Sequence, residues 1–410
     1  MIPKYTEQFW LTCYHIYEKI FIGNIMLNRI VNRTAAILRG AAKCCIAWCT
    51  RVRRPPEPVR TGKQSQIVAV LLVTYIFCSL NTYSQKLSPQ IKVLTKDTKT
   101  SLRGLSVVSD RVAWVSGSNG TIGQTTDSGK TWKWSIVKGF EKTDFRDIEA
   151  FDATTAIIMA IDSPAYILKT IDAGNTWKVV YENKAKGMFL DAMEFWNEQA
   201  GIVIGDPIDG HIFIARTFDG GNTWKEIPKS YQPKADSGEA LFAASGTNIR
   251  VLDKDEAVFV TGGLSSRIFI RDDKKRLPII QGRETTGANS VAVMDPGSRK
   301  GGNKMIVVGG DFNNPNSDSL NAFITADRGK TWKAPKESPN GYRSCVEYLS
   351  KQQLITCGIN GVDYSIDGGN IWRGISKEGF NVCRKAKNGS AVFLAGADGK
   401  IGKLLFSHKK

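Results

Sequence analysis

The chain of 410 residues carries 56 Lys and Arg against 39 Asp and Glu, a formal net charge of +17, together with 39 glycines and 10 tryptophans. The only histidines are His15, His211 and His408, which argues against a metal site built on several histidines and against a Ser-His-Asp triad. The basic excess is not arranged as a groove with interleaved aromatic residues, so nucleic acid is not expected as a partner. The length allows a sizeable core, and a repeat protein of this size can form a single unit.

The first 85 residues differ in character from the rest. They hold 11 Lys and Arg but 3 Asp and Glu, and residues 67–80 form an uncharged apolar run of 14 residues. That run is short for a membrane span and typical of a signal-peptide core, so a signal peptide is predicted over residues 63–85. We therefore expect an exported protein, periplasmic or secreted, which meets the membrane only through this segment if it stays uncleaved. Residues 1–62 are interpreted as an over-extended or disordered leader, with a membrane anchor as the alternative.

Five stretches repeat the pattern Ser/Thr-x-Asp-x-Gly-x-x-Trp, and we name them the Asp-box segments: 125–132, 170–177, 217–224, 325–332 and 365–372. The Asp can accept backbone N–H groups in a tight turn, and the Gly allows a positive φ. The Trp then begins the next strand with a large apolar ring. Five equivalent turns cannot converge on one substrate, so we assign them a structural role. Their key residues are Asp127, Gly129, Trp132, Asp172, Gly174, Trp177, Asp219, Gly221, Trp224, Asp327, Gly329, Trp332, Asp367, Gly369 and Trp372.

Seven apolar, β-branched runs recur at a period of roughly 40–57 residues and predict strands buried on both faces. This period predicts an all-β fold over residues 86–410, a seven-bladed β-propeller with Asp-box turns, with six blades as the fallback. The fourth unit has no complete Asp-box segment. The seventh ends after its third strand, so residues 90–95 are expected to supply the missing strand and close the ring. The expected inner strands are 102–108, 145–151, 189–195, 239–244, 288–294, 342–348 and 381–385.

Inner strands line the central channel of a propeller, and ligands bind at a mouth of that channel. Alignment of the expected inner strands places Arg103, Arg146 and Arg343 at one position. The next position holds Gly104, Asp147, Asp191, Glu239, Asn289 and Ser344, and the ends of the second strands add Asp162, Asp206 and Asp311. The predicted ligand-binding set is Arg103, Arg146, Asp147, Asp191, Glu239, Asn289, Tyr342 and Arg343. Guanidinium groups bind carboxylates through paired hydrogen bonds, so an acidic or glycan-like ligand is expected. The alternative is that these groups pair with one another around a water-filled channel. No catalytic residue, metal site or cofactor is assigned.

Beyond residue 85 the only cysteines are Cys345, Cys357 and Cys383. Cys345 and Cys357 are expected opposite each other on the first two strands of the sixth unit, where an exported protein permits a disulfide. Buried thiols are the alternative, and the sequence leaves both open.

The Asp-box segments, with Trp114-Val115-Ser116-Gly117-Ser118-Asn119-Gly120 ahead of the first, resemble the photosystem II stability/assembly factor-like proteins. The resemblance covers residues 100–405 and implies a bacterial relative of these exported or lumenal Asp-box (neuraminidase-type repeat) propellers. It further implies a monomeric, non-catalytic scaffold that binds a protein or glycan partner in the cell envelope.

Asp boxes also resemble those of sialidases and other glycoside hydrolases, the alternative function. Arg103, Arg146 and Arg343, with Glu239, Tyr342 and Asp147, are similar to the three arginines, the nucleophile pair and the acid of a sialidase. The Phe/Tyr-Arg-Ile-Pro signature of that family is absent.

Overall fold

The computed structural model describes residues 87–408 apart from 162, 254, 272 and 297–300. The described residues belong to one compact unit, residues 85–410. The expected leader and signal peptide lie outside the described residues. Within the described part, no helix combines the length and hydropathy that a membrane span needs.

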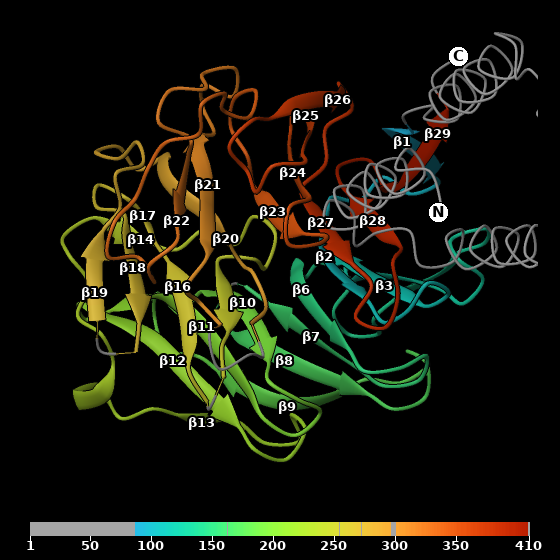
Figure 1. Cartoon of the computed structure of the whole chain (residues 1–410). Coiled ribbons are helices and arrows are strands. Elements are labelled where there is room, and N and C mark those ends of the chain that lie inside the picture. The colour runs from blue at the N-terminus through green and yellow to red at the C-terminus, as the bar shows by residue number, and fades with distance from the viewer. Residues whose placement is uncertain (1–86, 162, 254, 272, 297–300, 409–410) are drawn as a thin grey trace, which may run out of the picture. The chain divides into compact units, whose positions relative to one another are not determined.

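The described strands form seven antiparallel sheets, each one blade of a β-propeller (Figure 1). Blade 1 contains β2 (Leu102–Val107), β3 (Ala113–Gly117), β4 (Thr121–Thr125) and β5 (Lys133–Ile136). Blade 2 contains β6 (Phe145–Ala150), β7 (Ala156–Ala160), β8 (Ala165–Thr170) and β9 (Lys178–Asn183). Blade 3 contains β10 (Leu190–Phe195), β11 (Gly201–Ile208), β12 (His211–Thr217) and β13 (Lys225–Glu226), and the short 3-10 helix η1 (Lys229–Tyr231) follows it.

Blade 4 contains β15 (Ile249–Val251), β16 (Ala257–Val260), β18 (Arg267–Ile270) and β19 (Asp273–Arg276). Blade 5 contains β20 (Thr286–Val293), β21 (Met305–Asp311) and β22 (Ala322–Thr325), extended by β14 (Glu239–Ala240) and β17 (Gly262–Gly263). Blade 6 contains β23 (Cys345–Tyr348), β24 (Leu354–Gly358), β25 (Gly361–Ser365) and β26 (Arg373–Ser376). Blade 7 contains β27 (Val382–Lys385), β28 (Val392–Ala395), β29 (Lys400–His408) and β1 (Leu87–Lys96).

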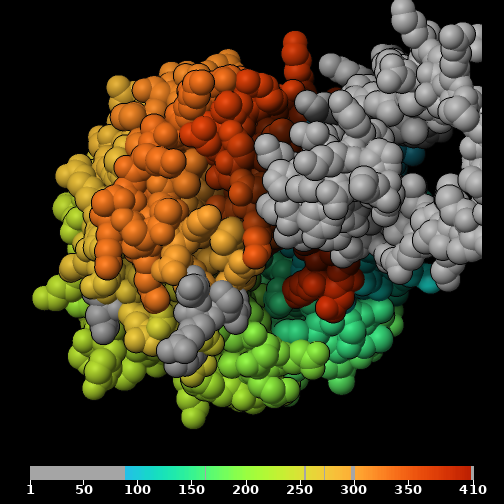
Figure 2. Space-filling view, in the orientation of Figure 1, coloured from blue at the N-terminus to red at the C-terminus, as the bar shows by residue number. Residues whose placement is uncertain are grey.

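The inner strands form a closed ring. Contacts join β2 to β6, β6 to β10, β10 to β15, β15 to β20, β20 to β23, β23 to β27, and β27 back to β2. In Figure 2 the colours accordingly pass round the propeller in chain order, and the red residues of the last blade meet the blue-green residues of the first. The expectation of seven blades is thus confirmed.

The core lies between neighbouring blades. One cluster joins Trp114 and Ile122 of blade 1 to Ile158 and Leu168 of blade 2, all of them buried. The strands responsible, such as β3 and β7, are buried along their whole length, as their unbroken apolar runs require. Each blade therefore depends on its neighbours to cover its faces.

The ring closes through a strand from the other end of the chain. β1 pairs antiparallel with β29 from Leu87 opposite His408 to Lys96 opposite Lys400. The predicted closing strand, 90–95, lies within β1.

The five Asp-box segments adopt one common turn. In the first, Thr125 Oγ1 donates to Asp127 Oδ1 at 2.9 Å and accepts the Gly129 N–H at 3.0 Å. Asp127 also accepts the N–H and hydroxyl of Thr131, and these bonds lower its pKa to about 2. The same bonds recur in the other four segments, with one exception. In the fifth segment Ile371 occupies the position of Thr131, so Asp367 accepts its backbone N–H but no hydroxyl from that residue.

The fourth blade corrects one expectation. Its inner strand is β15, not residues 239–244, because β14 pairs with β17 and joins the sheet of blade 5. The chain between Ala240 and Ala244 instead forms a loop at the channel mouth.

Candidate functional site at the channel mouth

Four inner strands contain a β-bulge near their start, where one residue has no partner on the second strand. The register shifts between Leu102 and Gly104 of β2, and at the equivalent points of β6, β10 and β20. The inserted residues are Arg103, Arg146, Asp191 and Asn289. Bulges of this kind redirect a side chain, and they bring these four residues into one register. Asp191 and Asn289 therefore share a position with Arg103 and Arg146, one residue away from where the sequence alignment puts them. The alignment is also wrong for Arg343, because this residue lies before the first residue of β23.

A cavity of about 550 Å³ lies at this end of the channel. Because second strands run antiparallel to inner strands, residues that follow a second strand reach the same mouth as residues that start an inner strand. The lining combines both groups with the loop of blade 4. It consists of Arg103, Arg146, Phe189, Asp206, Ala240, Leu241, Phe242, Ala243, Ala244, Asn289, Phe312, Tyr342, Ser344, Ile359 and Asn381.

The cations of the cavity are Arg103 and Arg146. Arg103 Nη1 donates to the Ala244 carbonyl at 3.3 Å, and burial, followed by the charge of Arg146, lowers the pKa of Arg103. Arg146 Nε donates to Asp144 Oδ2 at 2.8 Å, and its guanidinium lies 5.9 Å from the centre of the Phe189 ring. The positive charge of Arg146 thus acts on Arg103, and an anion bound beside Arg103 would offset it.

An apolar shelf lies beside these cations. The rings of Phe242 and Phe312 meet edge to face at 5.8 Å, and those of Phe312 and Tyr342 at 6.4 Å. Phe312 is 38 % exposed and Ile359 is 52 % exposed. The Tyr342 hydroxyl donates to Asn289 Oδ1 at 2.8 Å, and burial raises the pKa of Tyr342. The shelf thus offers apolar surface while its polar atoms already have partners.

Asp206 is the acid of the cavity. Its Oδ1 accepts the Leu241 N–H at 2.8 Å and so holds the loop of blade 4 in place, and burial raises the pKa of Asp206. Asp191 is fully buried behind it, and burial and then the charge of Asp206 raise the pKa of Asp191 well above its ordinary value.

The structure thus brings together four of the eight predicted ligand-binding residues: Arg103, Arg146, Asn289 and Tyr342. Asp147 and Asp191 are buried rather than part of the lining. Asp147 Oδ2 accepts the Met193 N–H at 2.8 Å, which ties blade 2 to blade 3.

Glu239 and Arg343 are each paired elsewhere. The Glu239 carboxylate accepts from Arg267 Nε at 2.9 Å and from the Thr261 hydroxyl. Arg343 is buried against Asp363, and both side chains are 1 % exposed. The three-arginine constellation that the sialidase resemblance implies is therefore not assembled, and the Tyr342 hydroxyl has no carboxylate partner.

Asp206 was expected at the end of its second strand and belongs to the lining, whereas Phe189, Phe312 and Ile359 are not among the predicted residues. Their positions carried a usable signal, since each lies just before an inner strand or at the end of a second strand. The loop that follows Ala240 gave no such signal, because the sequence of residues 239–244 predicts a strand.

The opposite mouth of the channel holds a network of paired charges. Arg250 contacts Glu194 at 3.3 Å and Glu347 at 3.1 Å, Arg384 contacts Glu194 at 3.6 Å, and Lys387 contacts Glu149. Burial raises the pKa of Glu149, although the charge of Lys387 acts to lower it. Burial likewise raises the pKa of Glu347, although the charge of Arg250 acts to lower it. These charges satisfy one another, so this mouth offers a ligand fewer free groups.

The sequence matches no protein-family profile and no curated protein. Among solved structures, the chain is similar to "YCF48 bound to D1 peptide" at 15 % identity and a TM-score of 0.55, covering 78 % of this chain and 95 % of that one. It is similar to YCF48 from Cyanidioschyzon merolae at 15 % identity and a TM-score of 0.56, covering 77 % and 98 %. It is also similar to the WD40 β-propeller domain of Doa1 at 14 % identity and a TM-score of 0.54, covering 79 % and 98 %. These likenesses establish the propeller fold.

Proposed function

We propose that this protein is a non-catalytic scaffold that binds a segment of a protein partner at the mouth lined by Arg103, Arg146, Phe312 and Ile359. The observation that carries the proposal is the pairing of two guanidinium groups with an exposed apolar shelf in one cavity. A peptide segment supplies both complements, a carboxylate for the arginines and an apolar side chain for the shelf.

A protein partner fits this cavity better than a glycan does. A sugar carries many hydroxyl groups and needs many free donors and acceptors, whereas the amide of Asn289 and the hydroxyl of Tyr342 are bonded to each other. One solved neighbour is a propeller bound to a peptide, which supports the same class of ligand. We further propose that the partner is a protein of the cell envelope and that the scaffold is an exported monomer, since residues 67–80 have the character of a signal-peptide core.

The test is site-specific photo-crosslinking in the source cells. A photoreactive phenylalanine analogue at Ile359 should capture a discrete protein partner, which mass spectrometry then identifies. The matched control places the analogue at Tyr231, which is 79 % exposed on η1, away from the cavity lining.

Arg103→Gln with Arg146→Gln should abolish the crosslink at Ile359. A peptide from the captured segment should bind the double variant at least about 100-fold more weakly by calorimetry, because the two lost charge-assisted hydrogen bonds contribute about 1.5–3 kcal/mol each. Equal capture from Tyr231, or capture that survives the double substitution, would refute the proposal. Capture of a glycan at Ile359 would refute the protein partner but would support the same binding site.

A further inference from the structure

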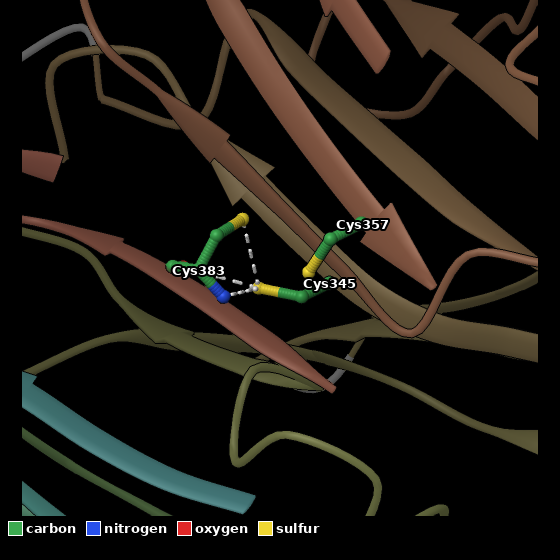
Figure 3. A group of neighbouring side chains, drawn as sticks. All are labelled: Cys345, Cys357 and Cys383. Carbon is green, nitrogen blue, oxygen red and sulfur yellow. Dashed lines mark hydrogen bonds between the residues drawn. The ribbon is translucent and has the colours of Figure 1, made fainter. Parts of the chain in front are cut away.

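The three cysteines of the described chain meet at one point in the core. Cys345 comes from β23, Cys357 from β24 and Cys383 from β27, so the group spans blades 6 and 7. All three are fully buried, and their sulfur atoms lie within 4.8 Å of one another. Figure 3 shows the side chain of Cys345 extending toward Cys383 from the adjacent blade, with Cys357 on its other side.

Part of this arrangement follows from the strand register. Cys345 lies directly opposite Cys357 in the β23–β24 pair, as the sequence predicts, but the two thiols are free. Cys383 joins them because β23 and β27 are neighbouring inner strands. Buried cysteines usually act as small apolar residues, and such a role gives no reason for every cysteine between residues 87 and 408 to gather at one point.

The sulfur of Cys345 also contacts the backbone of Cys383, whose carbonyl oxygen lies 3.2 Å away. The Cys383 N–H donates to Cys345 Sγ at 3.4 Å, and Cys383 Sγ lies 3.6 Å from Cys345 Sγ. Hydrogen bonds to a ligand sulfur are a common outer-shell feature of metal–thiolate centres.

We propose that Cys345, Cys357 and Cys383 form a three-coordinate site for a soft monovalent cation, Cu(I). Three sulfurs around an ion at bond lengths of about 2.3 Å are about 4 Å apart, so the observed spacing needs only small shifts. Thiolates select Cu(I), whereas structural Zn(II) requires a fourth ligand. Among the described His, Cys, Asp and Glu side chains, none beyond these three belongs to the group.

Binding consumes no redox equivalent. Cu(I) keeps its oxidation state, each sulfur that becomes a thiolate releases one proton to solvent, and copper–sulfur bonds replace sulfur–hydrogen bonds. The affinity should therefore rise with pH. Because the ligands come from two blades, the ion also joins blade 6 to blade 7, and it can enter only as these blades pack or when they open.

The experiment uses the full chain with Cys13, Cys44, Cys45, Cys49 and Cys78 replaced by Ser, so that only the three core cysteines remain. The protein is refolded without oxygen in Cu(I) buffered by bicinchoninate. We expect one copper per chain, three sulfur neighbours by X-ray absorption, and a raised unfolding temperature.

Cys383→Ala should weaken Cu(I) binding by about 100-fold or more, because two sulfurs remain. Val346→Ala is the matched control: it also truncates a fully buried side chain of β23 but keeps every thiol, and it should retain the copper. If Cys383→Ala does not fold, the sulfur count of the parent protein decides the matter. The proposal is overturned by a parent that retains no stoichiometric copper, by fewer than three sulfur neighbours, by equal binding in Cys383→Ala, or by displacement of Cu(I) by equimolar Zn(II).

Discussion

The buried ion pair of Arg343 and Asp363 provides a direct test of the assignment of Arg343 to the fold rather than to a ligand. Asp363 Oδ2 accepts from Arg343 Nε at 2.7 Å and from Nη2. Arg343 Nη1 donates to the Tyr342 carbonyl at 2.8 Å and to Asn360 Oδ1 at 2.6 Å. Replacement of Asp363 by Ala would leave the Nε and Nη2 donors of a buried guanidinium group without this acceptor.

The expected cost can be worked out in two ways. Two charge-assisted hydrogen bonds at about 1.5–3 kcal/mol each give about 3–6 kcal/mol, and loss of one partner from a buried ion pair costs about 3–5 kcal/mol. We therefore expect Asp363→Ala to lower the free energy of unfolding by about 3–5 kcal/mol. Urea unfolding followed by tryptophan fluorescence measures this loss.

Two further variants make the result specific. Asp363→Leu combined with Arg343→Met removes both charges and should recover much of the lost stability, because no unpaired charge remains buried. Glu337→Ala breaks the exposed pair with Arg373, whose side chains are 46 % and 61 % exposed, and should cost far less. A loss below about 1 kcal/mol for Asp363→Ala, or a double variant as unstable as the single one, would refute the structural assignment of Arg343.

Three further predictions concern the packing of the ring. Gly129→Ala should lower the free energy of unfolding by about 1–3 kcal/mol in a urea titration, because φ is +83° and a Cβ would lie 2.7 Å from Leu94 and 2.8 Å from Phe393; an unchanged midpoint would contradict this packing. Burial raises the pKa of Asp147 to about 8, so the native state holds a proton that the unfolded state releases above about pH 4. The stability that this proton contributes is therefore full below about pH 4 and is lost as the pH rises toward 8. Unfolding measured from pH 4 to 8 should show this decline, and Asp147→Asn should flatten it, whereas an identical slope in the variant would count against a protonated Asp147. Deletion of residues 400–410 removes β29 and leaves β1 and β28 without their shared partner, so size-exclusion chromatography should show aggregates, while deletion of residues 409–410 alone should leave a monomer.

The blades could be predicted from the sequence because they depend on local patterns. The Asp-box segments mark turns whose hydrogen bonds are made within eight residues, and apolar runs such as that of β7 identify the buried strands. The pairing of Cys345 with Cys357 could also be predicted, since it lies within one hairpin.

The site was only half predictable, because its geometry depends on non-local pairing. A bulge shifts the register by one residue, and nothing in the sequence around Asp191 or Asn289 distinguishes a bulge from regular pairing. Glu239 has the spacing of an inner-strand residue, but Arg267, which is 28 positions away, binds its carboxylate. Cys383 reaches Cys345 only because two blades are packed together.

The pairing of β1 with β29 also orders the events of biosynthesis. Leu87 of β1 lies opposite His408 of β29, so the ring has no complete set of blades until β29 has been made. Blade 7 can therefore form only after β29 has left the ribosome. Until that moment blades 1 and 6 each have one uncovered face, and an unfinished chain stays recognisable to proteases and chaperones by that surface.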